Sequence, residues 1–238
     1  MRNNLSKIAF LASIMLALTF TISCGEHLFD DNDPVNSGGD DSSSSVKGGG
    51  SKSSSSSEAA LVGEKGTFKD DRDNQTYKWV KIGTQVWMAQ NLNYFEPWVG
   101  PTRGNKCYDN KNANCEKYGR LYEWDDAIRV CPDGWHLPTE AEWNTLISAV
   151  GDDAGKKLKS KSDDWRDGAG TDIHGFGALP GGKLEGEFKE LNIAGVWWTS
   201  TEQTAGGSVV KYMNASNEVK YGWNDDKTQQ MSIRCLED

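Results

Sequence analysis

Cysteine gives the sequence its most reactive side chains: one of the five lies near the amino terminus and four lie farther along. The four are Cys107, Cys115, Cys131 and Cys235. An even number of cysteines in an exported domain predicts disulfides rather than free thiols. Four cysteines allow three pairings. We favour Cys107 with Cys115, which closes a short polar loop, and Cys131 with Cys235, which ties the middle of the domain to its end.

Other reactive groups give little sign of catalysis. The sequence has no C-x-x-C pair for zinc, and His136 and His174 stand isolated. It also lacks the G-x-S-x-G, P-loop and H-E-x-x-H motifs. We interpret His136 as structural, and Glu142 as the capping partner of Thr139 rather than a general acid or base. We therefore predict that the protein is not an enzyme.

Tryptophan is the most unusual feature of the composition, with ten residues, all between Trp79 and Trp223. Exposed aromatic rings can stack on the faces of sugars, so polysaccharide is a natural ligand class. Most of these tryptophans lie on apolar stripes or in the sequence blocks described below, and we interpret them as core residues. Trp98, Trp165 and Trp223 lie in or beside polar stretches, and we predict these three as ligand-binding residues.

The amino terminus predicts export. A positive start and an apolar stretch at residues 8–22, too short for a stable transmembrane helix, indicate a signal peptide over residues 1–23. The stretch ends at Cys24 in a pattern that resembles a bacterial lipobox, with Thr21 where leucine is usual. That resemblance implies cleavage before Cys24 and acylation of the new terminus, which would hold the protein on a membrane.

The organisation predicted from composition has three parts. After the signal peptide, residues 24–65 form an acidic, Ser/Gly-rich linker that cannot bury enough apolar surface to fold, so we expect a disordered tether. Residues 66–238 form a globular domain of ordinary size. Anchor, tether and head together predict an exported bacterial lipoprotein of the outer membrane or cell surface.

Charge excludes one class of partner. The net charge is −9, so the chain repels phosphate backbones and we expect no nucleic-acid binding. The densest basic cluster, at residues 156–161, is flanked by aspartates and is interpreted as a solvated helix face.

Hydrophobic periodicity predicts the elements that position these residues. Strands are expected at residues 76–82 and 85–89, around a Gly83-Thr84 turn. One helix is expected at residues 118–130, where Leu121, Trp124 and Ile128 share a face.

A second helix should begin at a capping box and end near Gly151, with a further helical turn at residues 154–158. Short strands follow at residues 176–179, 196–200, 208–213, 218–223 and 231–235. Strands, then helices, then many strands indicate an α+β domain.

A series of separate blocks carries a family resemblance. The blocks are Asn91-Leu92-Asn93-Tyr94, Tyr118-Gly119-Arg120-Leu121-Tyr122, Cys131-Pro132-Asp133-Gly134-Trp135-His136-Leu137-Pro138-Thr139, Gly175-Phe176-Gly177-Ala178-Leu179-Pro180-Gly181-Gly182, Trp197-Trp198-Thr199-Ser200 and Ser232-Ile233-Arg234-Cys235. In this order they resemble the Fibrobacter succinogenes major paralogous domain over residues 66–238. The resemblance implies an exported or lipid-anchored protein and no particular activity.

A wider resemblance suggests the fold. Residues 137–143 are similar to a segment of the formylglycine-generating, sulfatase-modifying enzymes, which have a variant of the C-type-lectin-like fold. This implies an α+β domain with two helices, a twisted antiparallel sheet and long loops. Those enzymes use a pair of reactive cysteines near the C-terminus. Only Cys235 stands in that region here, so the activity is not expected.

The lectin resemblance also raises the question of calcium. C-type lectins bind calcium partly through a Trp-Asn-Asp segment, which Trp223, Asn224 and Asp225 match, with Asp226 following. Their oxygens are suitable ligands for this hard cation. The companion Glu-Pro-Asn or Gln-Pro-Asp loop is absent, so a turn between strands is the alternative. Calcium at Asn224, Asp225 and Asp226 is a weak hypothesis, and no other cofactor is expected.

These observations predict a membrane-anchored, non-catalytic binding module displayed at the envelope, with polysaccharide or a surface protein as its partner. Two alternatives stay open: a degenerate sulfatase-modifying-like enzyme, and a structural or protein-contact envelope protein.

Overall fold

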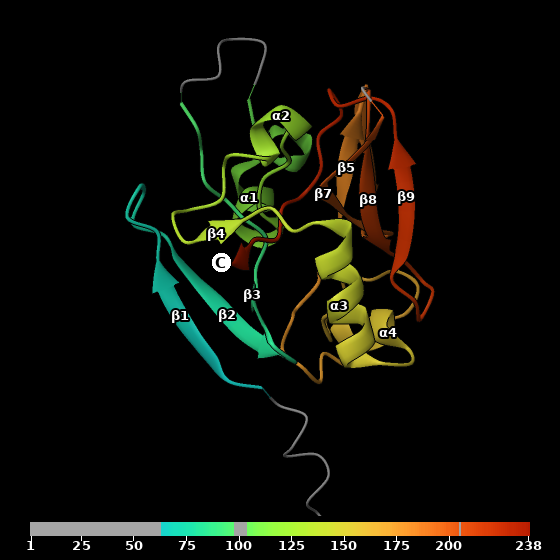
Figure 1. Cartoon of the computed structure of the whole chain (residues 1–238). Helices are drawn as coiled ribbons and strands as arrows, with labels where there is room; N and C mark the ends of the chain where they lie inside the picture. The colour runs from blue at the N-terminus through green and yellow to red at the C-terminus, as the bar shows by residue number, and fades with distance from the viewer. Residues whose placement is uncertain (1–62, 98–103, 205) are drawn as a thin grey trace, which may run out of the picture. The chain divides into compact units, whose positions relative to one another are not determined.

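Two five-stranded sheets and four α-helices make up the part of the chain that the computed structural model describes, residues 63–97, 104–204 and 206–238 (Figure 1). The predicted signal peptide, Cys24, most of the linker and Trp98 lie outside these residues. No helix within the described ranges is long and apolar enough to cross a membrane. The mixed α+β class is confirmed.

The first sheet joins the start of the head to its end. Its strands are β1 (Lys65–Lys69), β2 (Thr76–Ile82), β3 (Gln85–Met88), β10 (Leu236–Glu237) and β4 (Trp135–His136), in that order across the sheet. All neighbouring pairs are antiparallel. Leu236 lies opposite both Trp87 and His136, so the C-terminal strand is held between two earlier ones. The predicted strand at residues 76–82 is confirmed, and β3 ends one residue before its predicted limit.

The second sheet has the order β6-β5-β7-β8-β9, with β9 at an edge (Figure 1). Its strands are β5 (Gly181–Glu185), β6 (Glu187–Leu191), β7 (Gly195–Thr204), β8 (Gly207–Met213) and β9 (Lys220–Asn224). Three of the predicted strands correspond to β7, β8 and β9. The β5–β6 hairpin was not predicted, and residues 176–179 form only an isolated bridge, at Ala178.

The helices are α1 (Asn112–Tyr118), α2 (Trp124–Ala127), α3 (Glu140–Val150) and α4 (Ala154–Leu158), with a 3-10 turn at Tyr108–Asn110. The capping box that predicts α3 is present: the Thr139 hydroxyl accepts from the Glu142 amide, and the Glu142 carboxylate accepts from the Thr139 amide. Gly151, with φ of 74°, ends the helix as expected. The helices predicted at α3 and α4 are confirmed.

The single helix expected at residues 118–130 is wrong. Gly119 has φ of 79° and ends α1, and the chain then extends so that Leu121 and Tyr122 pair with Lys106 and Met231. Only the short α2 follows. The apolar residues of this segment therefore lie in extended chain and not along one face of a helix. The described residues contain four α-helices, whereas the lectin resemblance implied two.

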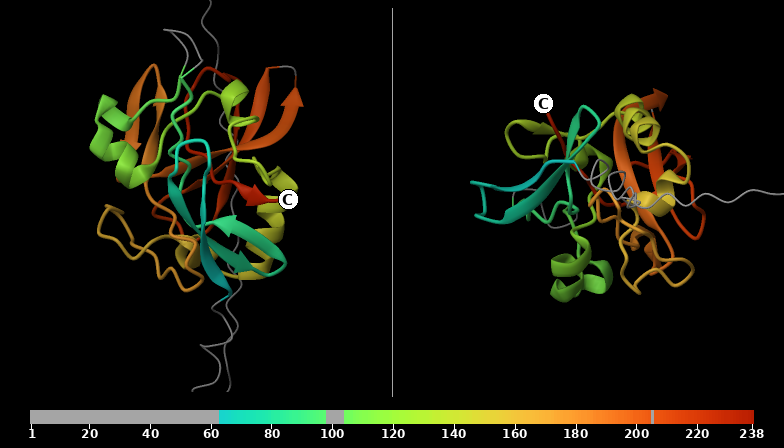
Figure 2. Two further views of the ribbon diagram at one scale, coloured as in Figure 1. Left: turned by 90° about the vertical axis from the view of Figure 1, so that its left-hand side faces the viewer. Right: turned by 90° about the horizontal axis from the view of Figure 1, so that it is seen from below.

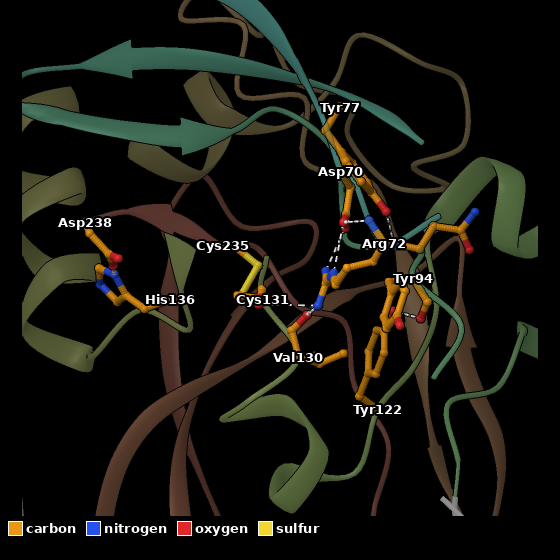
Figure 3. The surroundings of a disulfide bond; sticks show 11 residues. Asp70, Arg72, Tyr77, Tyr94, Tyr122, Val130, Cys131, His136, Cys235 and Asp238 are labelled. Carbon is orange, nitrogen blue, oxygen red and sulfur yellow. Dashed lines mark hydrogen bonds and ion pairs between the residues drawn. A yellow bond between two sulfur atoms is a disulfide. The ribbon is translucent and has the colours of Figure 1, made fainter. Parts of the chain in front are cut away.

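Both favoured disulfides are confirmed, Cys107–Cys115 and Cys131–Cys235. The second one lies beside the loop that joins β1 to β2 (Figure 3). In that loop Arg72 donates to both carboxylate oxygens of Asp70, at 2.9 and 2.7 Å, and to the Val130 carbonyl at 2.8 Å. The loop is thereby attached to the chain next to Cys131.

A buried cation occupies the centre of the domain. Arg234 donates to Asn91 Oδ1 through Nε and Nη2, at 3.1 and 2.8 Å, and to the Phe176 carbonyl at 2.6 Å. The same Asn91 oxygen accepts from Trp197 Nε1 at 2.9 Å, while Asn91 Nδ2 donates to the Tyr118 carbonyl. Burial lowers the pKa of Arg234 to about 9, so its charge persists at neutral pH. We call Asn91, Trp197 and Arg234 the central node.

A second buried cation corrects the interpretation of the basic cluster as a solvated helix face. Lys159 is 1% exposed, and its Nζ donates to the carbonyls of Gly168 and Asn214 at 2.9 and 2.8 Å. Burial, aided by the charge of Lys156, lowers the pKa of Lys159. This side chain holds loops together instead of facing solvent.

Replacing Asn91 tests the central node. We expect Asn91→Leu to cost about 3–5 kcal/mol of unfolding free energy, because it removes the side-chain acceptor of a buried charge and leaves only carbonyl acceptors. Asn91→Asp should cost less, since its carboxylate still accepts from Arg234 and Trp197 and its charge pairs with Arg234, which offsets the repulsion between its second oxygen and the Tyr118 carbonyl. Urea unfolding of the three proteins measures this order. Equal stability of the two variants would contradict the assigned role.

Acid should weaken the β1–β2 loop through Asp70. Burial alone would raise the pKa of this carboxyl, but the hydrogen bonds and charge of Arg72 outweigh burial and lower it. Its stabilisation is therefore full above the unfolded pKa of about 3.9 and is lost as the pH falls through the lower folded value. We expect Asp70→Asn to reduce the loss of stability on acidification below about pH 4. If the urea midpoints of the two proteins shift in parallel across this pH range, the stabilisation by Asp70 is excluded.

Candidate functional site

Of the three tryptophans predicted to bind ligand, only one lies at the surface in the described chain. Trp223 is on β9 and is 43% exposed. Trp165 is 4% exposed, and its Nε1 donates to Ser160 Oγ at 3.2 Å and to the Ala178 carbonyl at 3.3 Å. The prediction for Trp165 is therefore wrong: charged neighbours in the sequence surround a core residue. Trp98 lies outside the described residues.

A second aromatic ring accompanies Trp223. Tyr221 is 74% exposed and lies two positions earlier on β9. Alternate residues of a strand share a face, so the two side chains stand about 7 Å apart on one side of the sheet. Tyr221 was not predicted from the sequence, although the Tyr-Gly-Trp alternation of residues 221–223 is the signal that could have found it. We call this pair the β9 aromatic face.

Neighbouring groups fix the orientation of this face. Lys211 on β8 lies opposite Tyr221, with its Nζ 5.7 Å from the tyrosine ring centroid. The same Nζ bonds to Glu140 Oε1 at 3.3 Å and Asn144 Oδ1 at 2.9 Å on α3. The β9 aromatic face is thus on the α3 side of the sheet, and Figure 1 shows α3 beside β8 and β9.

Gly207 makes room for the Trp223 ring beside strand β8. A Cβ atom built on Gly207 would lie 2.4 Å from the ring, so only glycine lets the indole lie against the backbone of β8. The ring thus packs against this backbone and is still 43% exposed.

A cavity of about 510 Å³ adjoins the same strand. Trp223, Asn224 and Asp225 contribute to its lining, as do Tyr212 and three charged side chains of the β5–β6 hairpin, Lys183, Glu185 and Glu190. Its floor is apolar and consists of Val196, Val210 and Met231. A hydrogen bond from Lys183 lowers the pKa of Glu185.

The proposed calcium ligands are engaged in a turn. Asn224 Oδ1 accepts from the Asp226 amide at 2.8 Å, and Asn224 Nδ2 donates to Gln229. Asp226 Oδ1 accepts from the amide and hydroxyl of Thr228 at 2.9 and 2.6 Å. Within the described ranges, no group of three or more His, Cys, Asp or Glu residues could hold a metal ion. The geometry of Asn224, Asp225 and Asp226 is that of the alternative, a turn.

The groups considered for catalysis have structural partners. His136 Nδ1 lies 2.7 Å from Asp238 Oδ1, and His136 Nε2 lies 3.1 Å from Glu142 Oε1. Burial would raise the pKa of Glu142, but hydrogen bonds from Thr139 and His136 outweigh it and lower the pKa. Cys235 is bonded to Cys131, so it offers no thiol of the kind used by sulfatase-modifying enzymes.

Comparison with known proteins gives one match. A family model described as the Fibrobacter succinogenes major domain matches residues 80–237, from within β2 to β10. No curated protein and no solved structure matches the chain.

The two tryptophans should respond differently to truncation. We expect Trp165→Ala to cost about 3–5 kcal/mol, because it leaves a cavity in the core. Trp223→Ala should change the unfolding free energy by about 1 kcal/mol or less, since its ring is half exposed. Urea unfolding compares the two. A large loss from Trp223→Ala would show that the ring is needed for packing and would weaken the case for a binding surface.

Proposed function

Since the chain belongs to the Fibrobacter succinogenes major domain family, whose description specifies no activity, we propose from its own surface that it is a non-catalytic module that binds polysaccharide. The observation that carries this proposal is the β9 aromatic face. Two exposed rings on one side of an edge strand offer a platform on which successive sugars of a chain can stack.

The chemistry around the platform fits a sugar polymer. Glu140, Asn144 and Lys211 form a polar group beside Tyr221, and Glu140 is partly exposed. Sugars present apolar C–H faces and hydroxyl edges, so aromatic rings bordered by polar groups match both. An edge strand leaves the platform open along its length, which suits a chain better than a small molecule.

We further propose that the module is displayed at the outer membrane or cell surface as a bacterial lipoprotein. The support is the signal-peptide pattern, Cys24 and the Ser/Gly-rich linker. β1 begins at Lys65, one residue before the predicted start of the head. A linker of this composition and length would let a lipid-anchored head reach polymers beyond the membrane.

The finer fold assignment is a proposal as well. We propose a variant of the C-type-lectin-like fold, supported by the antiparallel first sheet, the long loops and residues 137–143 at the start of α3. The competing functions are a thiol-dependent enzyme and a protein-contact envelope protein. The two disulfides speak against the enzyme, because they leave no free thiol at the four cysteines of the head.

Removing both rings tests the proposed function. We expect the purified chain to bind at least one of cellulose, xylan or mannan in pull-down assays. The double variant Y221A/W223A should lose at least about tenfold in affinity, because each lost ring removes about 1 kcal/mol. The matched control is Phe95→Ala, which removes an aromatic ring that is 55% exposed elsewhere, and it should bind as the parent does.

Two results would contradict this function. One is a folded parent protein that binds no member of a broad glycan panel. The other is binding that survives Y221A/W223A unchanged. Capture of a specific envelope protein in the absence of glycan binding would favour the protein-contact alternative.

A further inference from the structure

A buried amine, a carboxamide and a carboxylate meet where helix α3 lies against the second sheet. Lys211 on β8 is 2% exposed, and its Nζ lies 2.9 Å from Asn144 Oδ1 and 3.3 Å from Glu140 Oε1. The right view of Figure 2 shows the yellow helices beside the orange strands of this sheet. An amine can replace the nitrogen of a carboxamide when a neighbouring acid–base group moves the protons.

We propose that Lys211 and Asn144 form an isopeptide bond, an amide between their side chains, and that Glu140 is the catalytic residue that carries the protons. The bond ties α3 covalently to β8. The inference concerns a modification of the chain itself, so it does not rest on the function proposed above.

The fold holds the reacting groups together. Glu140 and Asn144 are one turn apart on α3, so their side chains share one face of the helix. The Glu140 amide donates to Thr201 Oγ1 at 2.8 Å, which fixes the start of α3 on β7. Because Nζ contacts Oδ1, the carbonyl carbon of Asn144 is only one covalent bond farther away. Holding two groups in this way replaces a very high concentration of free reactants.

The surroundings protect the amine and leave an exit for ammonia. In the register of the sheet, Lys211 lies between the fully buried Trp197 on β7 and Tyr221 on β9, whose ring centroid is 5.7 Å from Nζ. Asn144 is exposed, and the Glu140 side chain is 33% exposed. The nucleophile is therefore shielded from water, while the leaving group can diffuse away.

The reaction balances without any co-reactant. Glu140 accepts one proton from the Lys211 ammonium, and the neutral amine attacks Cγ of Asn144. The tetrahedral carbon receives Nζ, and Glu140 passes its proton to Nδ2. Glu140 then accepts a second proton from Nζ as the Cγ–Nδ2 bond breaks and ammonia leaves. Nothing is oxidised or reduced. One turnover completes the bond, so only a small fraction of the pair needs to be a neutral amine and acid at any time.

The experiment is mass spectrometry of a tryptic digest of the full chain, after incubation of the folded protein and reduction of its disulfides. We expect the peptide that contains Asn144 to be joined to the peptide that contains Lys211, with a combined mass lower by one ammonia. Asn144→Ala and Lys211→Met should lack the joined peptide. If Lys211→Met does not fold, Asn144→Ala decides, because its side chain is exposed.

A matched pair of variants tests the role of Glu140. E140Q should slow the appearance of the joined peptide at least tenfold. The control E187Q removes a carboxylate from an exposed position on β6 and should form the joined peptide at the rate of the parent.

Three results would overturn the proposal. The first is a folded parent chain whose two peptides stay separate after prolonged incubation. The second is loss of ammonia from the Asn144 peptide alone, which shows succinimide formation on the backbone. The third is a joined peptide that forms in E140Q as fast as in the parent.

Discussion

The arrangement of the domain depends on one buried charge, the guanidinium of Arg234. A charge removed from water is stable only where hydrogen bonds surround it, and here the bonds come from segments far apart in sequence. Asn91 is the key partner, because its single oxygen accepts from both Arg234 and Trp197. The carbonyls of Met88 and Phe176 also accept from Arg234, and Phe176 belongs to a third segment. The C-terminal strand, the end of the first sheet and the centre of the second are therefore fixed together.

Strand pairing in the second sheet connects the central node to the surface. Trp197 on β7 lies opposite Lys211 on β8, and Lys211 lies opposite Tyr221 on β9. One row of side chains thus runs from the central node to the β9 aromatic face, on the side that α3 covers (Figure 1). The contact of Lys211 with Glu140 sets α3 against this row. The exposed rings stand on a rigid support, which lowers the entropy lost when a ligand binds.

Local signals in the sequence predicted part of this architecture. The capping box of α3 and the alternation in β2 depend on neighbouring residues, and both predictions are confirmed. The favoured cysteine pairs are confirmed too, and they had to be chosen from only three possible pairings. The helix expected at residues 118–130 does not form, because Leu121 and Tyr122 lie in extended chain and pair with Lys106 and Met231. These partners lie outside the segment, so its own sequence could not reveal them. Trp165 was misjudged for the same reason: its polar neighbours face solvent while its ring is buried. The exposure of Tyr221 depends on β9 being the edge strand of its sheet. The sequence alone does not specify which strand lies at the edge.

The most direct test of the account is an NMR titration of the ¹⁵N-labelled chain with a soluble cello-oligosaccharide, such as cellohexaose. If the module binds a sugar chain on the β9 aromatic face, the amide resonances that shift will belong to β9, to the facing residues of β8 and to the first turn of α3. The indole resonance of Trp223 will shift with them, while that of the buried Trp165 will not. Shifts confined to other surfaces, or none across a panel of soluble oligosaccharides with a folded protein, would contradict the account.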